Sequence, residues 1–503
     1  MRTYYKYLNE EQYTNLTKEC DRLLFASDTS LERVSIPWLH VIREHPVPLK
    51  KYEEIYFSVY SEMLNKYARK LRNWVYLFYS LLKNLRNDGK SWYESDTLPN
   101  QTDVLFISHL QNIDHAGKAE DFYFGSLPEK LYENECSVVV ALLNHMRLPS
   151  KTLVSRWSKS VGKSFPRVVF SKYIGISKEI KIFNRLRLES DRLFKKTSLK
   201  SSNLFRRVLS RASDEAFSPG AQMTLRLSEQ IGELVYRINP KVVVFTHEGH
   251  AWERCACYAI SNIDSDILRI AYQHSAVFRL QYAIRRKLID RYNPDQILVS
   301  GEISYRQLSN SEDLKSIPIS ILGSNRYIEN THQDYKKLSK RNTCLVIPEG
   351  YIEECNFIFE FCLDYALQLP KVRFIWRVHP MLNAGSILKN NKKLANLPNN
   401  VVLSNSSLEN DISHASCVLY RGSTAVVQSV VGGLRPFYFR IKGELTIDPL
   451  YELSKGREIV ENPYEFVHKF NKQPDLNDVK QAVEYCEKFY LPLNIPLLQR
   501  IAC

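Results

Sequence analysis

Polar side chains that could act on a substrate follow an apolar run in the segment FTHEGHAWER, residues Phe245–Arg254. His247, Glu248, Gly249 and His250 come where a strand would end and a helix would begin, the place where parallel sheets bind ligands. Gly249 permits a tight turn. Glu248 is placed to act as a general base or to bind substrate hydroxyls, although it could instead complement the dipole of the following helix. The number of polar residues favours a functional site.

A second candidate site lies in FIWRVHPML, residues Phe374–Leu382, where an apolar run ends in Arg377, His379 and Pro380. Proline ends a strand and exposes the residues before it. A guanidinium and an imidazole at such a point suit a phosphate, and the imidazole could protonate a departing phosphate. A His-Pro pair also occurs often by chance, so this segment needs support from elsewhere in the chain.

That support comes from LYRGSTAVVQSVVGG, in which Gly422, Ser423 and Thr424 separate a predicted strand from a predicted helix. Backbone N–H groups and hydroxyls at a helix start form an anion site, whereas a serine that only caps the helix is the structural alternative. Since this segment and His379 lie on neighbouring strand–helix units, they predict one phosphate pocket. His274, after the strand ILRIAYQ, is expected on the cleft side of the first domain, as a substrate contact or a structural histidine.

Strands alternate with helical stretches twice along the chain, from Asp103 and again from Cys344. This pattern predicts parallel sheets joined by right-handed crossovers. The expected fold is therefore α/β, with two Rossmann-like domains facing across a cleft and a helical N-terminal extension. The expected boundaries are 1–98 for the extension, 99–335 and 336–475 for the two domains, with a linker near 335, and 476–503 for a C-terminal helix.

The formal net charge of +14 is concentrated in Lys151–Ala212, which holds 17 Lys and Arg against three Asp and Glu. An anionic partner or a solvated helical face explains this segment equally well. Nucleic acid is disfavoured because no aromatic or glycine-rich recognition module accompanies it. The apolar and aromatic run Lys66–Arg86, flanked by basic residues, predicts a helix in a membrane interface or, more commonly, a helix packed on the next domain.

Several other chemistries are disfavoured. SVGKS, residues Ser160–Ser164, is not a P-loop because Trp157 stands where glycine is needed. Neither a GxGxxG fingerprint nor metal-ligand spacing occurs, so no cofactor and no metal are expected. The N-terminal MRTYYKYLNEEQ lacks the apolar core of a signal peptide, no run reaches the roughly 18 apolar residues of a membrane span, and the ten cysteines show no metal or redox pairing. These features predict a cytoplasmic protein with reduced thiols.

With these clusters, roughly residues 100–470 resemble glycosyltransferases of the two-Rossmann (GT-B) architecture. More narrowly, they resemble bacterial transferases that use CMP-activated sugar acids, namely the Kdo transferases of capsule and O-antigen synthesis and the sialyl- and polysialyltransferases. The matching motifs are His379-Pro380, Ser423-Thr424 and Glu248-Gly249. His247 departs from the sialyl pattern, where an acidic residue often stands, and this leaves a retaining mechanism open beside an inverting one.

The resemblance implies that His379 contacts the CMP phosphate and assists its departure, while Glu248 activates the acceptor hydroxyl. It assigns residues around the nucleotide sugar to Arg377, Pro380, Gly422, Ser423, Thr424, Glu349 and Gly350, and cleft or acceptor positions to His247, Gly249, His250 and His274. The implied reaction needs no metal and transfers Kdo or a sialic-acid-like nonulosonate. Its acceptor would be an anionic surface polysaccharide of the capsule or lipopolysaccharide, or a lipid-linked glycan, with peripheral contact at the inner membrane.

Two alternatives remain open from the sequence. A transferase of polyol phosphate from CDP-glycerol or CDP-ribitol would share the phosphate pocket and an affinity for anionic polymers. A non-catalytic glycan- or nucleic-acid-binding protein would use the basic segment Lys151–Ala212, and would leave the paired strand-end clusters without a purpose.

Overall fold

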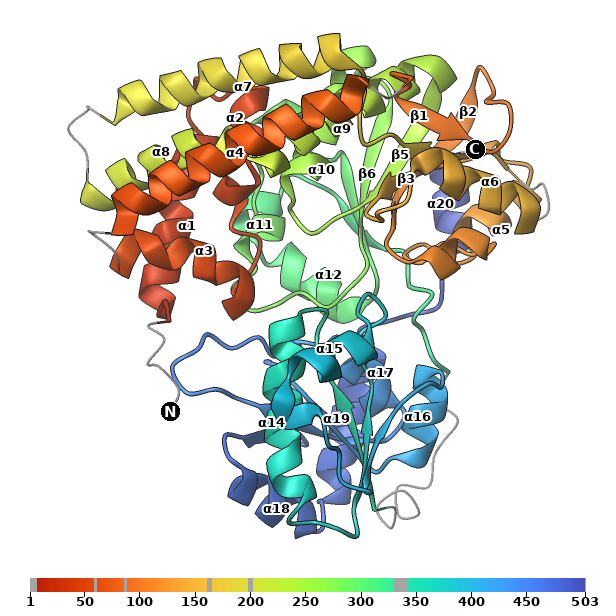
Figure 1. Ribbon diagram of the computed structural model, residues 1–503. Coiled ribbons are helices and arrows are strands. Elements are labelled where there is room, and N and C mark those ends of the chain that lie inside the picture. Colours follow the sequence, from red (N-terminus) through yellow and green to blue (C-terminus); the bar gives the residue numbers. More distant parts are fainter. Residues whose placement is uncertain are drawn as a thin grey trace.

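The computed structural model describes residues 7–57, 61–85, 88–160, 165–197, 202–329 and 342–502. Two α/β domains lie one above the other in Figure 1, and the N-terminal helices pack on the first. The expected architecture of two Rossmann-like domains with a helical N-terminal extension is confirmed.

The first domain contains an eight-stranded sheet in the order β1-β4-β3-β2-β5-β6-β7-β8. Its strands are β1 (Trp92–Glu94), β2 (Thr102–Leu110), β3 (Val138–Asn144), β4 (Arg167–Phe170), β5 (Pro240–Thr246), β6 (Leu268–Gln273), β7 (Gln296–Val299) and β8 (Ile319–Ile321). All pairs are parallel except β1 with β4. Strand β3 is buried along Val138–Leu143, because helices cover both faces of such a sheet. Strand β1, which ends the helical extension, was not predicted.

The second domain contains a six-stranded parallel sheet in the order β11-β10-β9-β12-β13-β14. Its strands are β9 (Thr343–Ile347), β10 (Arg373–Trp376), β11 (Val401–Leu403), β12 (Cys417–Tyr420), β13 (Arg435–Phe439) and β14 (Glu458–Val460). The chain begins in the middle of this sheet, builds outward to β11, and then returns to the other side of β9. The first domain does the same around β2. Loops diverge at such a switch point and leave a crevice at the carboxyl ends of the strands.

Helices cover both sheets (Figure 1). In the first domain they are α5 (Leu127–Glu133), α6 (Ser150–Ser160), α7 (Ile176–Lys196), α8 (Asn203–Glu215), α9 (Pro219–Ile238), α10 (Ala251–Ile263), α11 (Tyr282–Arg285) and α12 (Glu302–Ser309). In the second they are α14 (Ile352–Ala366), α15 (Ala384–Asn390), α16 (Leu408–His414), α17 (Ala425–Val431), α18 (Pro463–Asn471) and α19 (Leu476–Glu487). Short 3-10 turns are η1 (Pro37–His40), η2 (Ile113–Gly117), η3 (Asp290–Tyr292), η4 (Glu312–Leu314) and η5 (Lys392–Leu394).

The N-terminal extension consists of α1 (Glu10–Leu24), α2 (Leu31–Val34), α3 (Pro46–Phe57) and α4 (Ser61–Leu85). Its apolar side chains share one core with α7, α8 and α9, in which Leu23 and Trp38 are buried with Leu186. Arg33 Nε lies 2.7 Å from Glu189 Oε1 of α7, and both side chains are buried. The extension is therefore packed as part of the first domain.

The basic segment Lys151–Ala212 contains β4, α7 and most of α6 and α8. Many of its cations are paired: Arg185 contacts Glu32 and Glu229, and Arg211 contacts Glu54. Its positive charge is thus partly neutralised by the extension and by α9. Gly162 of SVGKS and the predicted linker near residue 335 lie outside the described residues.

After α19 the chain crosses back to the first domain. The Leu491 N–H donates to the Ser300 carbonyl over 3.0 Å, and the Ser324 N–H donates to the Leu491 carbonyl over 2.8 Å. The last helix, α20 (Ile495–Ala502), buries Leu498 and Ala502 in the first domain's core. The C-terminal segment therefore connects the domains a second time.

We predict that Leu498→Ala lowers the free energy of unfolding by about 2–5 kcal/mol, because it removes a fully buried side chain from a packed core. Urea unfolding followed by circular dichroism measures the change. Arg500→Ala, at an exposed position of the same helix, is the matched control and should change stability by less than about 0.5 kcal/mol. Equal effects of the two substitutions would contradict the packing of α20.

Candidate functional site

The loops at the carboxyl ends of the two sheets face each other and are in contact. Arg326, beyond β8, has Nη1 3.5 Å from Thr424 Oγ1, and its carbonyl accepts a hydrogen bond from Gln428 Nε2 over 3.3 Å. Asn112 Nδ2, beyond β2, donates to the Pro380 carbonyl over 3.3 Å. The strand-end segments of both domains therefore meet in one interdomain cleft.

The turn after β5 is organised by Glu253, in the first turn of α10. The buried carboxylate accepts backbone hydrogen bonds from the N–H groups of Glu248, Gly249 and His250, over 2.7–3.1 Å. It also lies 3.0 Å from His247 Nδ1, and burial lowers the pKa of this imidazole. His247 is thus buried beneath the turn, and the Glu253 contacts fix the direction in which Glu248 points.

Gly249 is required in this turn for two reasons. Its φ of +88° lies in the left-handed region, and a Cβ at this position would be 2.4 Å from the carbonyl carbon of Ala283. A side chain would push the turn away from α11. The sequence expectation of a tight turn at Gly249 agrees with this geometry.

Glu248 lies among hydrogen-bond donors at the cleft surface, with its side chain 35% exposed. His250 Nε2 is 3.2 Å from Glu248 Oε2, His274 Nε2 is 3.7 Å from Glu248 Oε1, and Ser275 Oγ donates over 3.4 Å. Burial alone would raise the pKa of Glu248, but the His250 hydrogen bond and the positive charge of Arg43 hold that pKa well below its usual value. The carboxylate is ionised at neutral pH and presents an acceptor to the cleft.

Imidazoles form the floor of the cleft on the first-domain side. His109 Nδ1 lies 2.8 Å from His145 Nε2, and His109 Nε2 lies 2.9 Å from Thr246 Oγ1, so the ends of β2 and β5 are joined. Burial lowers the pKa of His109 well below its ordinary value and lowers the pKa of His274 to about 4. These two imidazoles are neutral at pH 7. His109 was missed by the sequence analysis although it lies near the end of the apolar strand β2.

The N-terminal extension also reaches the cleft. Arg43 Nη1 and Nη2 lie 3.0 and 3.3 Å from the two carboxylate oxygens of Glu349, and His45 Nε2 lies 2.5 Å from Glu349 Oε2. Burial would raise the pKa of Glu349, but Arg43 and His45 lower it to about 2. No local sequence pattern marks Arg43 or His45 as site residues, because only the tertiary fold brings them to β9.

The loop after β9 packs directly on the loops after β10 and β12. A Cβ on Gly350 would lie 3.2 Å from His379 Nδ1, and a Cβ on Gly422 would lie 2.6 Å from Glu349 Cδ. Both glycines thus admit a neighbouring polar side chain at close range. Among the predicted site residues, Gly350 therefore lies against His379, and Gly422 lies against Glu349.

His379 is held in this cluster with its Nδ1 accepting from the Met381 N–H over 3.3 Å. Burial lowers the pKa of His379; Glu349 opposes this effect and the positive charge of Arg326 adds to it. The imidazole is therefore neutral at pH 7. A bound anion would raise its pKa, since opposite charge stabilises the protonated form.

The remaining predicted residues divide into two groups. Ser423 is buried and Thr424 half-buried beside Arg326, where α17 begins. Arg377 instead turns toward α16: its Nη1 lies 2.8 Å from Asp411 Oδ2 and 2.6 Å from the Ser406 carbonyl. Its charge is engaged within the second domain, so the cationic group next to Thr424 is Arg326, which the sequence analysis did not single out.

Arg326 differs from the other cleft cations in its partners. Arg43 is paired with Glu349, whereas no ion pair joins Arg326 to a carboxylate within the described part of the chain. Its positive charge reaches His274 in the first domain and His379 in the second. An unneutralised guanidinium beside the Thr424 hydroxyl is a site suited to an anion.

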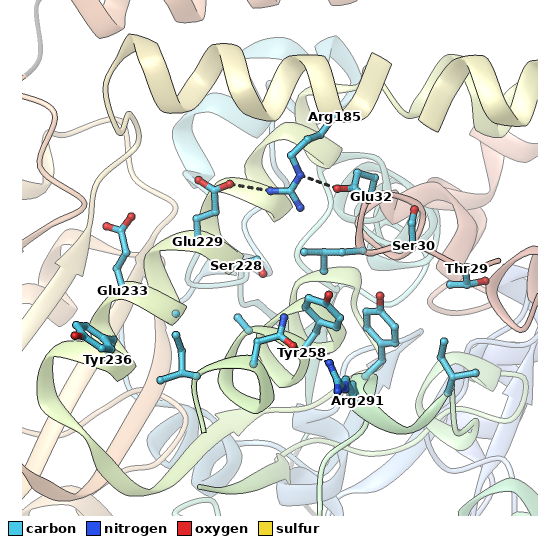
Figure 2. Close-up of a pocket in the computed structure, with 17 residues that line it drawn as sticks. Thr29, Ser30, Glu32, Arg185, Ser228, Glu229, Glu233, Tyr236, Tyr258 and Arg291 are labelled. Carbon is cyan, nitrogen blue, oxygen red and sulfur yellow. Dashed lines mark hydrogen bonds and ion pairs between the residues drawn. The ribbon is translucent and has the colours of Figure 1, made fainter. Parts of the chain in front are cut away.

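A separate cavity of about 970 Å³ lies away from the strand ends, between α2, α7, α9 and α10. Figure 2 shows Arg185 between Glu32 and Glu229 on its wall, at 2.6 and 3.0 Å, with Glu233, Tyr236, Tyr258 and Arg291 nearby. The ion pairs of Arg185 are made between protein groups, and none of the predicted site residues lines the cavity. The cleft is therefore the stronger candidate for chemistry.

Neither a protein-family model nor a curated protein matches this chain. Among solved structures it is similar to the glycotransferase of kitacinnamycin, at 12% identity and a TM-score of 0.47, covering 81% of this chain and 100% of that one. It is also similar to UDP-GlcNAc 2-epimerase from Neisseria meningitidis bound to UDP-GlcNAc, at 12% identity and a TM-score of 0.42, covering 79% and 97%. A third is MurG from Acinetobacter baumannii, at 10% identity and a TM-score of 0.43, covering 79% and 99%. At these scores the activity has to be inferred from the site itself.

We predict that Glu253→Ala destabilises the protein by about 1–3 kcal/mol, because three buried or half-buried N–H donors lose their acceptor. Urea unfolding measures this loss. Glu312→Ala, in an exposed side chain, is the control and should change stability by less than about 0.5 kcal/mol. Unchanged stability in Glu253→Ala would contradict the role assigned to this carboxylate.

We predict that the stability contribution of Glu349 depends on pH in a defined window. Its pKa is about 2 in the folded protein against an ordinary 4.5, so the contribution is complete above pH 4.5 and is lost as the pH falls toward 2. The shift corresponds to on the order of 3 kcal/mol.

Urea unfolding of wild type and Glu349→Gln at several pH values measures this dependence. The difference between them should be largest at neutral pH and should narrow below pH 4.5. Glu353→Gln, at a nearby exposed position, should show no such narrowing. A constant difference across the window would overturn the assignment.

Proposed function

We propose that the protein is a glycosyltransferase that transfers a sugar acid from a CMP-activated donor to a hydroxyl of a bacterial surface polysaccharide or lipid-linked glycan. The observation that carries the proposal is the position of Arg326, which has no carboxylate partner within the described residues. Arg326 lies beside Thr424 on one side of the cleft, and Glu248 with His274 lies on the other. The cleft thus offers an anion site on one wall and a carboxylate acceptor on the other. Sugar transfer from a nucleotide needs both.

In this proposal the donor phosphate lies against Ser423, Thr424 and Arg326. The bond between the anomeric carbon and the phosphate oxygen breaks, and its electron pair remains on the phosphate. Fixed hydrogen-bond donors aimed at the developing charge lower the barrier without reorganisation. His379, whose pKa burial lowers, gains a proton more readily when the phosphate is bound and delivers it to the departing CMP.

The acceptor hydroxyl approaches from the first-domain side. As the new bond forms between its oxygen and the anomeric carbon, its proton is transferred to Glu248, which is ionised and oriented by His250 and Ser275. A weakly basic carboxylate suffices when the anomeric carbon carries cationic character, because the hydroxyl becomes acidic as it bonds. His250 and His274 line the same wall and would contact acceptor hydroxyls.

CMP as the nucleotide and a sugar acid as the transferred group rest on the His379-Pro380, Ser423-Thr424 and Glu248-Gly249 motifs. A carboxylate on the donor would add a second negative charge near Arg326, which is consistent with this choice. The acceptor class rests on the same resemblance. In this proposal Arg377 does not bind the phosphate, because its guanidinium is paired with Asp411.

We predict CMP release from one donor among CMP-Kdo, CMP-sialic acid and other CMP-nonulosonates, measured with and without candidate acceptors. Replacing His379 by Ala or Glu248 by Gln should lower the rate by about 10²–10⁴-fold, as expected when a proton-transfer group is lost. His468→Ala, at an exposed position on α18, is the matched histidine control and should retain wild-type activity.

Parallel assays with CDP-glycerol, CDP-ribitol and UDP-GlcNAc distinguish the competing donors. Turnover of a CDP-polyol without turnover of any CMP sugar would replace the proposal by polyol-phosphate transfer. Tight CMP binding by calorimetry without turnover of any donor would indicate a non-catalytic binding protein. Wild-type activity in His379→Ala and Glu248→Gln would remove both residues from the mechanism.

A further inference from the structure

Helix α4 presents its apolar residues outward, the reverse of the usual pattern for a helix packed on a soluble domain. The outward side chains are 46–67% exposed in the described structure: Tyr67, Leu71, Trp74, Val75, Phe78, Tyr79, Leu82 and Leu85. Their spacing of three and four residues places most of them on one broad stripe. We name these eight residues the α4 apolar face.

The inward stripe of the same helix is largely polar. Asn73, Ser80 and Asn84 are buried together with Leu77. Asn73 Nδ2 donates to the Asp214 carbonyl over 3.3 Å, and Asn84 Oδ1 accepts from the Gly175 N–H over 2.9 Å. These hydrogen bonds fix the rotation of the helix about its axis, so the apolar stripe cannot turn inward without breaking them.

Helix α7 extends this surface. The Trp74 and Phe183 rings lie 5.7 Å apart, which places α4 and α7 side by side, as Figure 1 also shows. Exposed apolar side chains on α7 are Ile180, Leu188 and Phe194. An exposed apolar surface of this extent on a soluble domain marks an interaction site.

Basic residues accompany the apolar ones. Helix α4 carries Lys66, Arg69, Lys70, Arg72 and Lys83 against one Glu, and α7 adds exposed Lys181 and Arg187. Arg69 is paired with Glu54, but Arg72 and Arg187 are exposed. Aromatic and aliphatic side chains bordered by Lys and Arg are the composition of helices that lie in the interface of an anionic bilayer, where Trp and Tyr are also favoured.

We infer that the α4 apolar face, together with the adjoining surface of α7, docks the protein on an anionic lipid bilayer. The described helices include none with the length and hydropathy to cross a membrane, so the helix would lie along the surface. In Figure 1, α4 and α7 run across the end of the first domain that is distant from the second. The bilayer would therefore contact only the first domain and leave the second free to receive a nucleotide donor.

Co-sedimentation with vesicles of phosphatidylglycerol and phosphatidylethanolamine tests this inference, with phosphatidylcholine vesicles as the uncharged reference. The wild-type protein should bind the anionic vesicles, and binding should weaken with added salt. The double substitution Trp74→Glu/Phe78→Glu should lower the apparent affinity at least about tenfold, since it replaces two inserted side chains by charges. Phe78→Leu should retain binding.

Tyr464→Glu is the matched control, because Tyr464 is an exposed aromatic residue on α18 of the second domain. This variant should bind the anionic vesicles with the affinity of the wild type. Circular dichroism checks that each variant is folded. Equal vesicle binding by the wild type and the double variant, or no binding by the wild type, would overturn the inference. A wild-type dimer in solution that becomes monomeric in the double variant, without lipid binding, would assign the face to self-association and also overturn the inference.

CMP release without vesicles tests the proposed function separately.

Discussion

The buried carboxylate of Glu349 is the point at which three parts of the chain depend on one another. It belongs to the loop after β9, it is bound by Arg43 and His45 from the N-terminal extension, and it occupies the space left open by Gly422 after β12. A carboxylate at 8% exposure is stable only when it is paired, and the loss of one partner of a buried pair costs about 3–5 kcal/mol. The contact between the N-terminal extension and the second domain therefore depends on an ionised Glu349.

The same constraint explains why the two sheets face each other as they do. Each domain has its switch point between the first of its parallel strands and the strand that returns beside it, at β2–β5 and at β9–β12. Charged and polar groups line the crevice at each switch point. In the first domain these are Glu248 and the imidazoles, and in the second they are Glu349 and its partners beside Gly422. Contacts from Arg43 to Glu349 and from Arg326 to Thr424 bring these crevices together. A substrate held in one crevice is consequently within reach of groups in the other.

The sequence predicted those parts of the fold and site that depend on local pattern. The alternation of strands and helical stretches from Asp103 and from Cys344 predicted the two parallel sheets, and polar residues directly after apolar runs made Glu248, His379 and Ser423 candidate site residues. Gly249 was predicted in a tight turn, and its φ of +88° agrees. The pattern could not reveal Arg43, His45 or Arg326, because their roles arise from contacts with residues distant in the chain. Nor could it show that Arg377 pairs with Asp411, since a strand-end position does not determine where a long side chain turns. The outward direction of the α4 apolar face also required the hydrogen bonds of Asn73 and Asn84.

The balance of charges among the cleft residues gives a reason for substrate-dependent proton transfer. Burial keeps His109 and His274 neutral, and Glu349 is paired with Arg43 and His45. Glu248 lies beside His250, and the hydrogen bond between them raises the pKa of His250 against the effect of burial. The charge of Arg326 then has no counterpart among the described residues, and it helps to keep the pKa of His379 low. An anionic phosphate beside Thr424 would supply that counterpart and would reverse the sign of the field at His379. The imidazole would become a proton donor only when the donor phosphate is in place, which couples protonation of the leaving group to occupancy of the site.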